Sequence, residues 1–290
     1  MKKVLFATTA LVMTAGAASA DIDLVGFARF GVVYNDGTED WNLTNRFQLD
    51  VIGTTEADNG MEFGGKVRMR ITSAGDYMNA NGTTTNGFND PMLWVSSDGL
   101  TLMVGNVEYA LDNMPGLAMP SPGLLGLEFI SPAISIPGYG SNAINGSDAV
   151  AMTYEMDAFA AHLSYDPVYE GTDMYVAYTF SGYTFALGYQ DAYAYSTEWA
   201  AAVSGDIANI GFNASYADNG SDGDAYGVGF DYDINSALNV SGFVAYVDAL
   251  DDANYGVGFA YDLGGGAALK GSVGYLIEYT VADFGVTFNF

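Results

Sequence analysis

The sequence predicts an all-β fold, a 16-stranded antiparallel transmembrane β-barrel with an inward-folded third loop. Three observations lead to it: an export signal opens the chain, apolar residues then alternate with polar ones between short turns, and the chain ends inside that alternation. The last residues, 283–290, read DFGVTFNF, with an apolar side chain at every second position. Because a free terminus is usually polar and frayed, we expect a final strand that closes the barrel on the first, with Phe290 at the periplasmic interface.

Residues 1–20 have the three parts of a secretory signal peptide. Lys2 and Lys3 precede an apolar run, and Ala18-Ser19-Ala20 supplies the small residues of a cleavage site. The run is too short for a membrane-spanning helix; a buried N-terminal helix is the alternative. The barrel is therefore predicted over residues 21–290.

Composition limits the partners and the fold. Of 8 Lys and Arg, two lie in the signal, which leaves six against 35 Asp and Glu. Nucleic acid is excluded as a partner, because phosphate binding needs a basic face. The chain has no cysteine to form disulfides, and after residue 20 no apolar run is long enough for a spanning helix. A closed β-barrel is the other structure that satisfies every backbone polar group in a bilayer.

Period-two alternation then marks the strands in order. Residues 22–34 place Phe30 on one face and Arg29 on the other, residues 45–53 continue the pattern, and residues 61–72 separate apolar from polar side chains completely. The further strands are predicted at 90–97, 99–106, 149–156, 158–166, 173–180, 183–190, 197–204, 207–216, 225–233, 238–247, 254–262, 267–275 and 279–290.

The connections alternate in length. Tight turns are expected at 97–99, 156–158, 181–182, 205–206, 233–237 and 263–266. Longer polar loops such as 217–224 and 248–253 lie between them, and outward tyrosines flank both ends of the strands. This asymmetry, with two aromatic belts, is typical of outer-membrane barrels. A soluble β-sandwich or propeller is the alternative.

The loop at 106–148 differs from the others. It is long and apolar, and Leu117, Leu124 and Phe129 within it need burial. Because a barrel of this size encloses a water-filled lumen, the loop is predicted to fold inward and narrow the channel. An outward lid or a subunit contact is the alternative.

Basic residues of the predicted polar face gather on the first three strands. On the lipid face each would cost roughly 2–4 kcal/mol, so they are expected in the lumen. Acids on the long loop, with Asp50 and Glu62 on the wall, would face them and set ion selectivity; hydrated wall residues without a selective role are the alternative. The candidate selectivity residues are Arg29, Arg46, Lys66, Arg68, Arg70, Glu108, Asp112 and Glu128.

Enzymatic chemistry and cofactors are not expected. The single histidine, His162, has no persuasive catalytic partner in the sequence and is predicted to be a hydrated wall residue. Without cysteine, thiol nucleophiles and Cys/His metal sites are excluded. The acidic stretches 222–224 and 248–252 could hold calcium, or bridge through divalent cations to lipopolysaccharide.

Five features carry a resemblance to the trimeric general porins of the Rhodobacter type over the whole mature chain. They are the stretches DIDLVGFARFGVVYN (21–35), WNLTNRFQLDVIGTTEADNGMEFGGKVR (41–68), VGNVEYALD (104–112) and YDLGGGAALKGSVG (261–274), and the terminal Phe290. The resemblance implies a homotrimer latched through the second long loop, 74–89, a basic wall, a constriction formed by 106–148, and a role of Phe290 in outer-membrane insertion. The third loop of this chain is more apolar and less acidic than is typical of the family.

The predicted function is passive diffusion of ions and small hydrophilic solutes across the outer membrane of a Gram-negative bacterium. A solute-selective channel, or a plugged surface structural protein or adhesin, is the alternative. The excess of acids favours weak cation preference, whereas the basic wall favours anions locally.

Overall fold

The computed structural model describes residues 20–37, 40–72, 86–127, 148–168, 170–192, 195–248, 251–276 and 278–290. The predicted signal peptide and the predicted latch at 74–89 therefore lie almost entirely outside the described residues.

Within these ranges, seventeen strand segments form one antiparallel sheet. They are β1 (Ala20–Asn35), β2 (Asp40–Glu56), β3 (Glu62–Thr72), β4 (Asn86–Phe88), β5 (Met92–Ser97), β6 (Leu100–Gly105), β7 (Ala149–Met156), β8 (Phe159–Asp166), β9 (Gly171–Phe180), β10 (Tyr183–Ala192), β11 (Tyr195–Ile207), β12 (Ile210–Asp218), β13 (Asp224–Asp233), β14 (Leu238–Val247), β15 (Asp252–Gly264), β16 (Ala267–Leu276) and β17 (Tyr279–Asn289).

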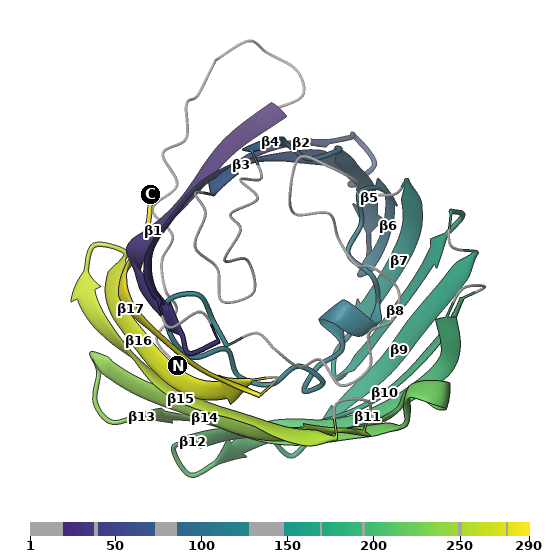
Figure 1. The fold of residues 1–290 in the computed structure, drawn as a ribbon. Helices are drawn as coiled ribbons and strands as arrows, with labels where there is room; N and C mark the ends of the chain where they lie inside the picture. Colours follow the sequence, from purple (N-terminus) through teal and green to yellow (C-terminus); the bar gives the residue numbers. More distant parts are fainter. Residues whose placement is uncertain are drawn as a thin grey trace.

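The sheet closes on itself, as the terminal pattern predicts. β1 pairs with β2 on one side and with β17 on the other, with Phe30 opposite Val286. Figure 1 shows the resulting ring, in which the purple first strand lies beside the yellow last one. The backbone of Phe290 exchanges two hydrogen bonds with Gly26, at 2.8 and 3.1 Å, and so extends the pairing to the last residue.

The barrel has sixteen strand positions because β4 and β5 share one of them. Both pair with β3; β5 corresponds to the predicted strand 90–97, and β4 precedes it, in the stretch predicted as the second long loop. Between them Pro91 has no N–H to donate to the ladder, while the side chain of Asn89 accepts from the Arg68 N–H at 2.7 Å. The interruption thus follows from the local sequence, and the predicted strand number is confirmed.

One predicted turn is wrong. Gly205 and Asp206 remain inside β11, and the reversal comes at Ala208 and Asn209. Ala208 has φ 59°, the left-handed conformation that a tight hairpin requires. Several strands also extend a few residues beyond the predicted limits, since pairing continues past the apolar alternation.

The two faces of the wall differ as expected for a membrane barrel. Outward side chains such as Leu187 and Phe30 are 62% and 54% exposed, whereas the lumen-facing Glu198 and Asp173 are 0% and 1% exposed. Outward tyrosines stack in cross-strand pairs, with ring centroids 5.5 Å apart for Tyr226 and Tyr246. None of the described helices is long and apolar enough to cross a membrane.

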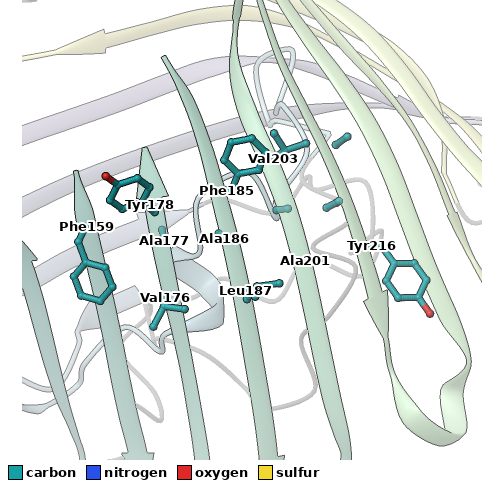
Figure 2. Close-up of a pocket in the computed structure, with 13 residues that line it drawn as sticks. Phe159, Val176, Ala177, Tyr178, Phe185, Ala186, Leu187, Ala201, Val203 and Tyr216 are labelled. Atoms are coloured by element: carbon teal, nitrogen blue, oxygen red, sulfur yellow. The ribbon is translucent and has the colours of Figure 1, made fainter. Parts of the chain in front are cut away.

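A shallow apolar groove of about 710 Å³ runs over the outer face of β8 to β12. Figure 2 shows its lining, which includes Val176, Phe185, Leu187 and Tyr216. These positions alternate with the lumen-facing ones of the same strands, so the groove faces the membrane. It lies outside the solute path.

Candidate pore constriction

Residues 106–127 follow the inner wall of the barrel as the first part of the long loop. They include a short 3₁₀ turn, η1 (Leu111–Asn113). In Figure 1 this teal segment lies within the ring of strands. Its hydrogen-bond partners lie on β8, β9, β12, β17 and β1, so it crosses more than half of the wall positions. The prediction of an inward fold agrees with these contacts; residues 128–147 lie outside the described part.

The wall beneath the loop is made of small residues. A Cβ at Gly188 would lie 2.4 Å from Leu111, and a Cβ at Gly229 would lie 2.1 Å from Pro120. At Gly256 a Cβ would lie 2.2 Å from Leu127. All three distances are shorter than van der Waals contact, so glycine is needed at these positions for the loop to approach the strands.

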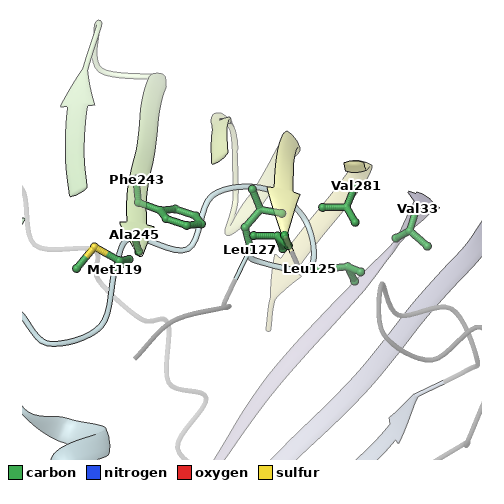
Figure 3. Close-up of a cluster of buried hydrophobic side chains, with 8 residues drawn as sticks. Val33, Met119, Leu125, Leu127, Phe243, Ala245 and Val281 are labelled. Atoms are coloured by element: carbon green, nitrogen blue, oxygen red, sulfur yellow. The ribbon is translucent and has the colours of Figure 1, made fainter. Parts of the chain in front are cut away.

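Apolar side chains of the loop pack into this wall as two main clusters. Leu111, Met114 and Leu117 contact a row of alanines: Ala177, Ala186, Ala200, Ala202 and Ala217. Figure 3 shows the second cluster, in which Met119, Leu125 and Leu127 meet Phe243 and Val281. Leu117 and Leu124, which the sequence marks as needing burial, are 0% and 3% exposed. Burial of this kind favours a loop that lies on the wall.

Two matched serine–aspartate pairs hold the loop by its backbone N–H groups. On β8 and β9, Ser164 donates to Asp173, which accepts the Leu111 N–H at 2.8 Å. On β16 and β17, Ser272 donates to Asp283 at 2.9 Å. Asp283 in turn accepts the N–H groups of Leu124 at 3.0 Å and Leu125 at 2.8 Å.

The middle of the loop is held by its carbonyl groups. The Asn213 side chain on β12 donates to Gly116 O at 3.1 Å and to Ala118 O at 2.8 Å. Ser215 donates to Leu117 O at 3.1 Å. Near the start of the loop, the Tyr109 hydroxyl donates to Asp166. Buried backbone groups of the loop are thus paired with side chains of the wall.

The predicted basic residues lie on neighbouring strands of the lumen wall. Arg29 and Arg46 are directly opposite each other on β1 and β2. On β3, Arg70 donates to the Gln48 side chain at 3.0 and 2.8 Å, and Lys66 lies opposite Ile52. Arg68 forms a two-bond ion pair with Asp50.

Arg29 lies under the described part of the loop. It is 6% exposed, and its Nη1 donates to the carbonyl oxygens of Leu124 and Leu125, each at 3.4 Å. Lys66, Arg68 and Arg70 keep a partly exposed surface on the lumen side. Arg29 therefore contacts the loop backbone, and the three β3 residues keep part of their surface exposed.

Of the three loop acids expected to oppose this wall, two are described. Glu108 is partly buried and Asp112 is exposed, and both lie in the first part of the loop near β8 and β9. Glu128 lies outside the described residues. Further lumen-facing acids that the sequence analysis did not select include Asp206 and Asp231, which flank Gly211 below the loop.

Barrel closure adds Lys270 to the basic residues predicted from the sequence. Lys270 on β16 pairs in register with Gly285, which pairs with Gly31 on β1. It therefore belongs to the same wall as Arg29 and Arg46. Only the closed ring reveals this, because Lys270 lies more than two hundred residues after them in the chain.

His162 is buried, contrary to the prediction of a hydrated residue. It faces inward from β8 with 4% exposure, and its ring meets the edge of Tyr175 at a centroid distance of 5.8 Å. Among the residues that the structure describes, no group of three or more His, Asp or Glu could hold a metal ion.

A closed barrel of sixteen strands, with a loop along its inner wall and charged groups beside it, defines a channel of the bacterial outer membrane. The family model of Gram-negative porins matches residues 7–279, and the chain belongs to that family. A porin of Fuscovulum blasticum is 30% identical over 219 residues, which cover 70% of this chain and 72% of the relative.

Solved structures agree with this assignment. A mutant of Rh. blastica porin has 26% identity and a TM-score of 0.82, covering 93% of this chain and 100% of its own. A triple mutant of Rhodopseudomonas blastica porin has 28% identity and a TM-score of 0.82, with the same coverage. The protein is thus a general diffusion porin, a multi-pass β-barrel of the outer membrane, and not an enzyme.

Proposed function

We propose that ions and small hydrophilic solutes diffuse passively through the barrel past a constriction formed by loop 106–148. One observation carries this proposal. The described part of the loop is fixed along the wall from β8 to β1, while Lys66, Arg68 and Arg70 keep partly exposed surface in the lumen. A loop fixed to the wall narrows the water-filled space beside it without filling it.

Single-channel recording tests this directly. The refolded mature protein in a planar bilayer with concentrated KCl is expected to give stepwise, ohmic currents. A correctly folded barrel that inserts and stays silent would instead mean that the loop plugs the lumen, and the protein would then be a surface structural protein or adhesin.

We propose a weak preference for cations as the selectivity of this constriction. Arg46, Lys66, Arg68 and Arg70 would form its basic side, and Glu108, Asp112 and Glu128 its acidic side. Two features support a reduced positive field: Arg68 is paired with Asp50, and Arg29 is held under the loop. Lumen acids such as Asp206 and Asp231 attract cations in addition. The reversal potential in a KCl gradient measures the sign, and anion selectivity would refute the proposal.

We propose a homotrimer embedded in lipid and lipopolysaccharide as the working assembly. The resemblance to trimeric porins supports the trimer, and the apolar outer face supports the lipid contact. Currents that close in thirds within one insertion event would identify three pores per particle. Chemical cross-linking that stops at a monomer would contradict the assembly.

Divalent cations are proposed to bridge the acidic outer loops to lipopolysaccharide. Neighbouring loops already meet there, since the Asp224 N–H donates to Asp248 Oδ2 at 3.0 Å. Metal between such carboxylates would offset their repulsion. A chelator should then lower the melting temperature of the trimer in lipopolysaccharide, and an unchanged temperature would rule the bridge out.

A further inference from the structure

We infer that Leu124 and Leu125 of the constriction loop act as a staple across the seam where the barrel closes, and that Asp283 is its main positioning residue. The seam is the contact between β1 and β17, the first and last strands. The loop would then have a second role besides narrowing the channel, because it would hold the first and last strands of the barrel together.

The first observation is steric. Gly31 on β1 and Gly285 on β17 lie directly opposite each other across the seam. A Cβ on Gly31 would be 2.5 Å from Leu124 Cδ2, and one on Gly285 would be 2.7 Å from the same atom. The Leu124 side chain therefore fills a socket formed by one glycine from each side of the seam.

The second observation is polar and independent of the first. Asp283 on β17 accepts the N–H groups of Leu124 and Leu125, at 2.8 to 3.0 Å. Arg29 on β1 donates to the carbonyl oxygens of the same two residues, each at 3.4 Å. Two successive residues of the loop thus lie between an anion of the last strand and a cation of the first.

A third contact extends the staple along the seam. Leu125 belongs to the same buried cluster as Val33 of β1 and Val281 of β17. Apolar groups from both strands, the carboxylate of Asp283 from β17 and the guanidinium of Arg29 from β1 therefore converge on Leu124 and Leu125. Asp283 should dominate the polar part, because its hydrogen bonds of 2.8 to 3.0 Å are shorter than the 3.4 Å bonds of Arg29.

The contact between β1 and β17 costs more conformational entropy to form than the contact between the two strands of a hairpin. Adjacent hairpin strands are joined by a few residues, whereas β1 and β17 are joined through the whole chain. Closing so long a loop costs more entropy than closing a hairpin, and a contact bridging the two strands offsets part of that cost.

The chain offers a matched control near the start of the loop. Asp173, with Ser164, accepts the Leu111 N–H, just as Asp283, with Ser272, accepts those of Leu124 and Leu125. Leu111 fills the space over Gly188 on β10. These contacts hold the loop on β8 to β10, away from the seam.

The experiment compares four variants: Asp283→Ala, Asp173→Ala, Leu124→Ala and Leu111→Ala. In unboiled SDS gels, the temperature at which the folded band converts to the unfolded band reports barrel opening. Each seam variant should convert at a temperature lower by about 5 °C or more than its matched control. Both Asp283→Ala and Asp173→Ala should also give larger and noisier single-channel currents, because each releases one of the points at which the described part of the loop is held.

The staple would be overturned if the seam variants lowered the conversion temperature no more than their matched controls do, even if the currents change as expected. If Asp283→Ala fails to fold, the leucine pair decides, because both leucine variants keep every strand residue. Silent channels in the unmodified protein would refute the proposed function and leave the thermal comparison intact.

Discussion

Asp50 and Arg68 form a two-bond ion pair across β2 and β3 in the channel wall. Arg68 Nε lies 2.7 Å from Asp50 Oδ1, and Nη2 lies 2.7 Å from Oδ2. The side chains are 10% and 15% exposed, respectively. Parallel bonds of this kind are among the stronger polar contacts in proteins. The pair therefore removes one positive charge from the field that a passing ion meets.

Replacing Asp50 by asparagine should expose that charge. The Asp50→Asn variant is expected to shift the reversal potential in a KCl gradient toward anions. It should also lose about 1–3 kcal/mol of stability, because Arg68 loses a charged partner. Glu62→Gln serves as the control: this exposed acid accepts from Trp94 on the same wall, and its loss should shift the potential less. An equal shift in both variants would contradict the pairing argument.

Removing basic residues should act in the opposite direction. Lys66→Gln and Lys270→Gln each delete one lumen charge and should each shift the reversal potential toward cations. If closure of the barrel places Lys270 in the basic wall, Lys270→Gln will shift the reversal potential in the same direction as Lys66→Gln. No shift for Lys270→Gln would show that solutes do not sense it.

Adding a methyl group to the wall should displace the loop. In Gly229→Ala the new Cβ would lie 2.1 Å from Pro120 Cδ, so the loop must move into the lumen. We expect lower single-channel conductance and a cost of about 1–3 kcal/mol from overpacking. Gly53→Ala is the matched control, because a Cβ at Gly53 has no atom within 4 Å. Unchanged conductance in Gly229→Ala would mean that the loop is not fixed at this point.

A charge on the outer groove should destabilise the barrel in the membrane. Leu187 lies in the middle of β10, points outward and is 62% exposed to the surroundings. Leu187→Arg should cost roughly 2–4 kcal/mol in a bilayer. Ser96→Arg, on the lumen side of β5, should cost much less, since the lumen is hydrated. Refolding into lipid vesicles at a series of urea concentrations measures both; equal losses would contradict the assignment of the two faces.

The strands were predictable because period-two alternation persists through nearly every one of them. The turn at Gly205 and Asp206 was predicted wrongly for a physical reason: both are good turn formers, yet Ser204 and Asp206 continue the lumen-facing series of β11. The left-handed φ of Ala208 carries the reversal instead, and alanine gives no turn signal. Likewise, the alternation of apolar and polar residues does not indicate the break at Pro91 between β4 and β5.

The contacts of the loop were less accessible to sequence reasoning. Its apolar side chains predict burial, but only the closed ring shows that Gly188, Gly229 and Gly256 make room for them. Asp173 and Asp283 look like ordinary lumen acids until the register places each beside a serine and beneath the loop. The basic strands were visible as a pattern, whereas the position of Lys270 depends on which strand follows which around the barrel.

The way the loop is fixed leaves its water-facing side open to change. The wall binds backbone N–H and C=O groups of the loop, and these are the same whatever side chain a residue carries. Exposed positions such as Ala118 and Ser121 can therefore take other side chains while the N–H and C=O contacts of the loop persist. A single scaffold of this kind can acquire channels of different permeability through a few substitutions, with the barrel itself unchanged.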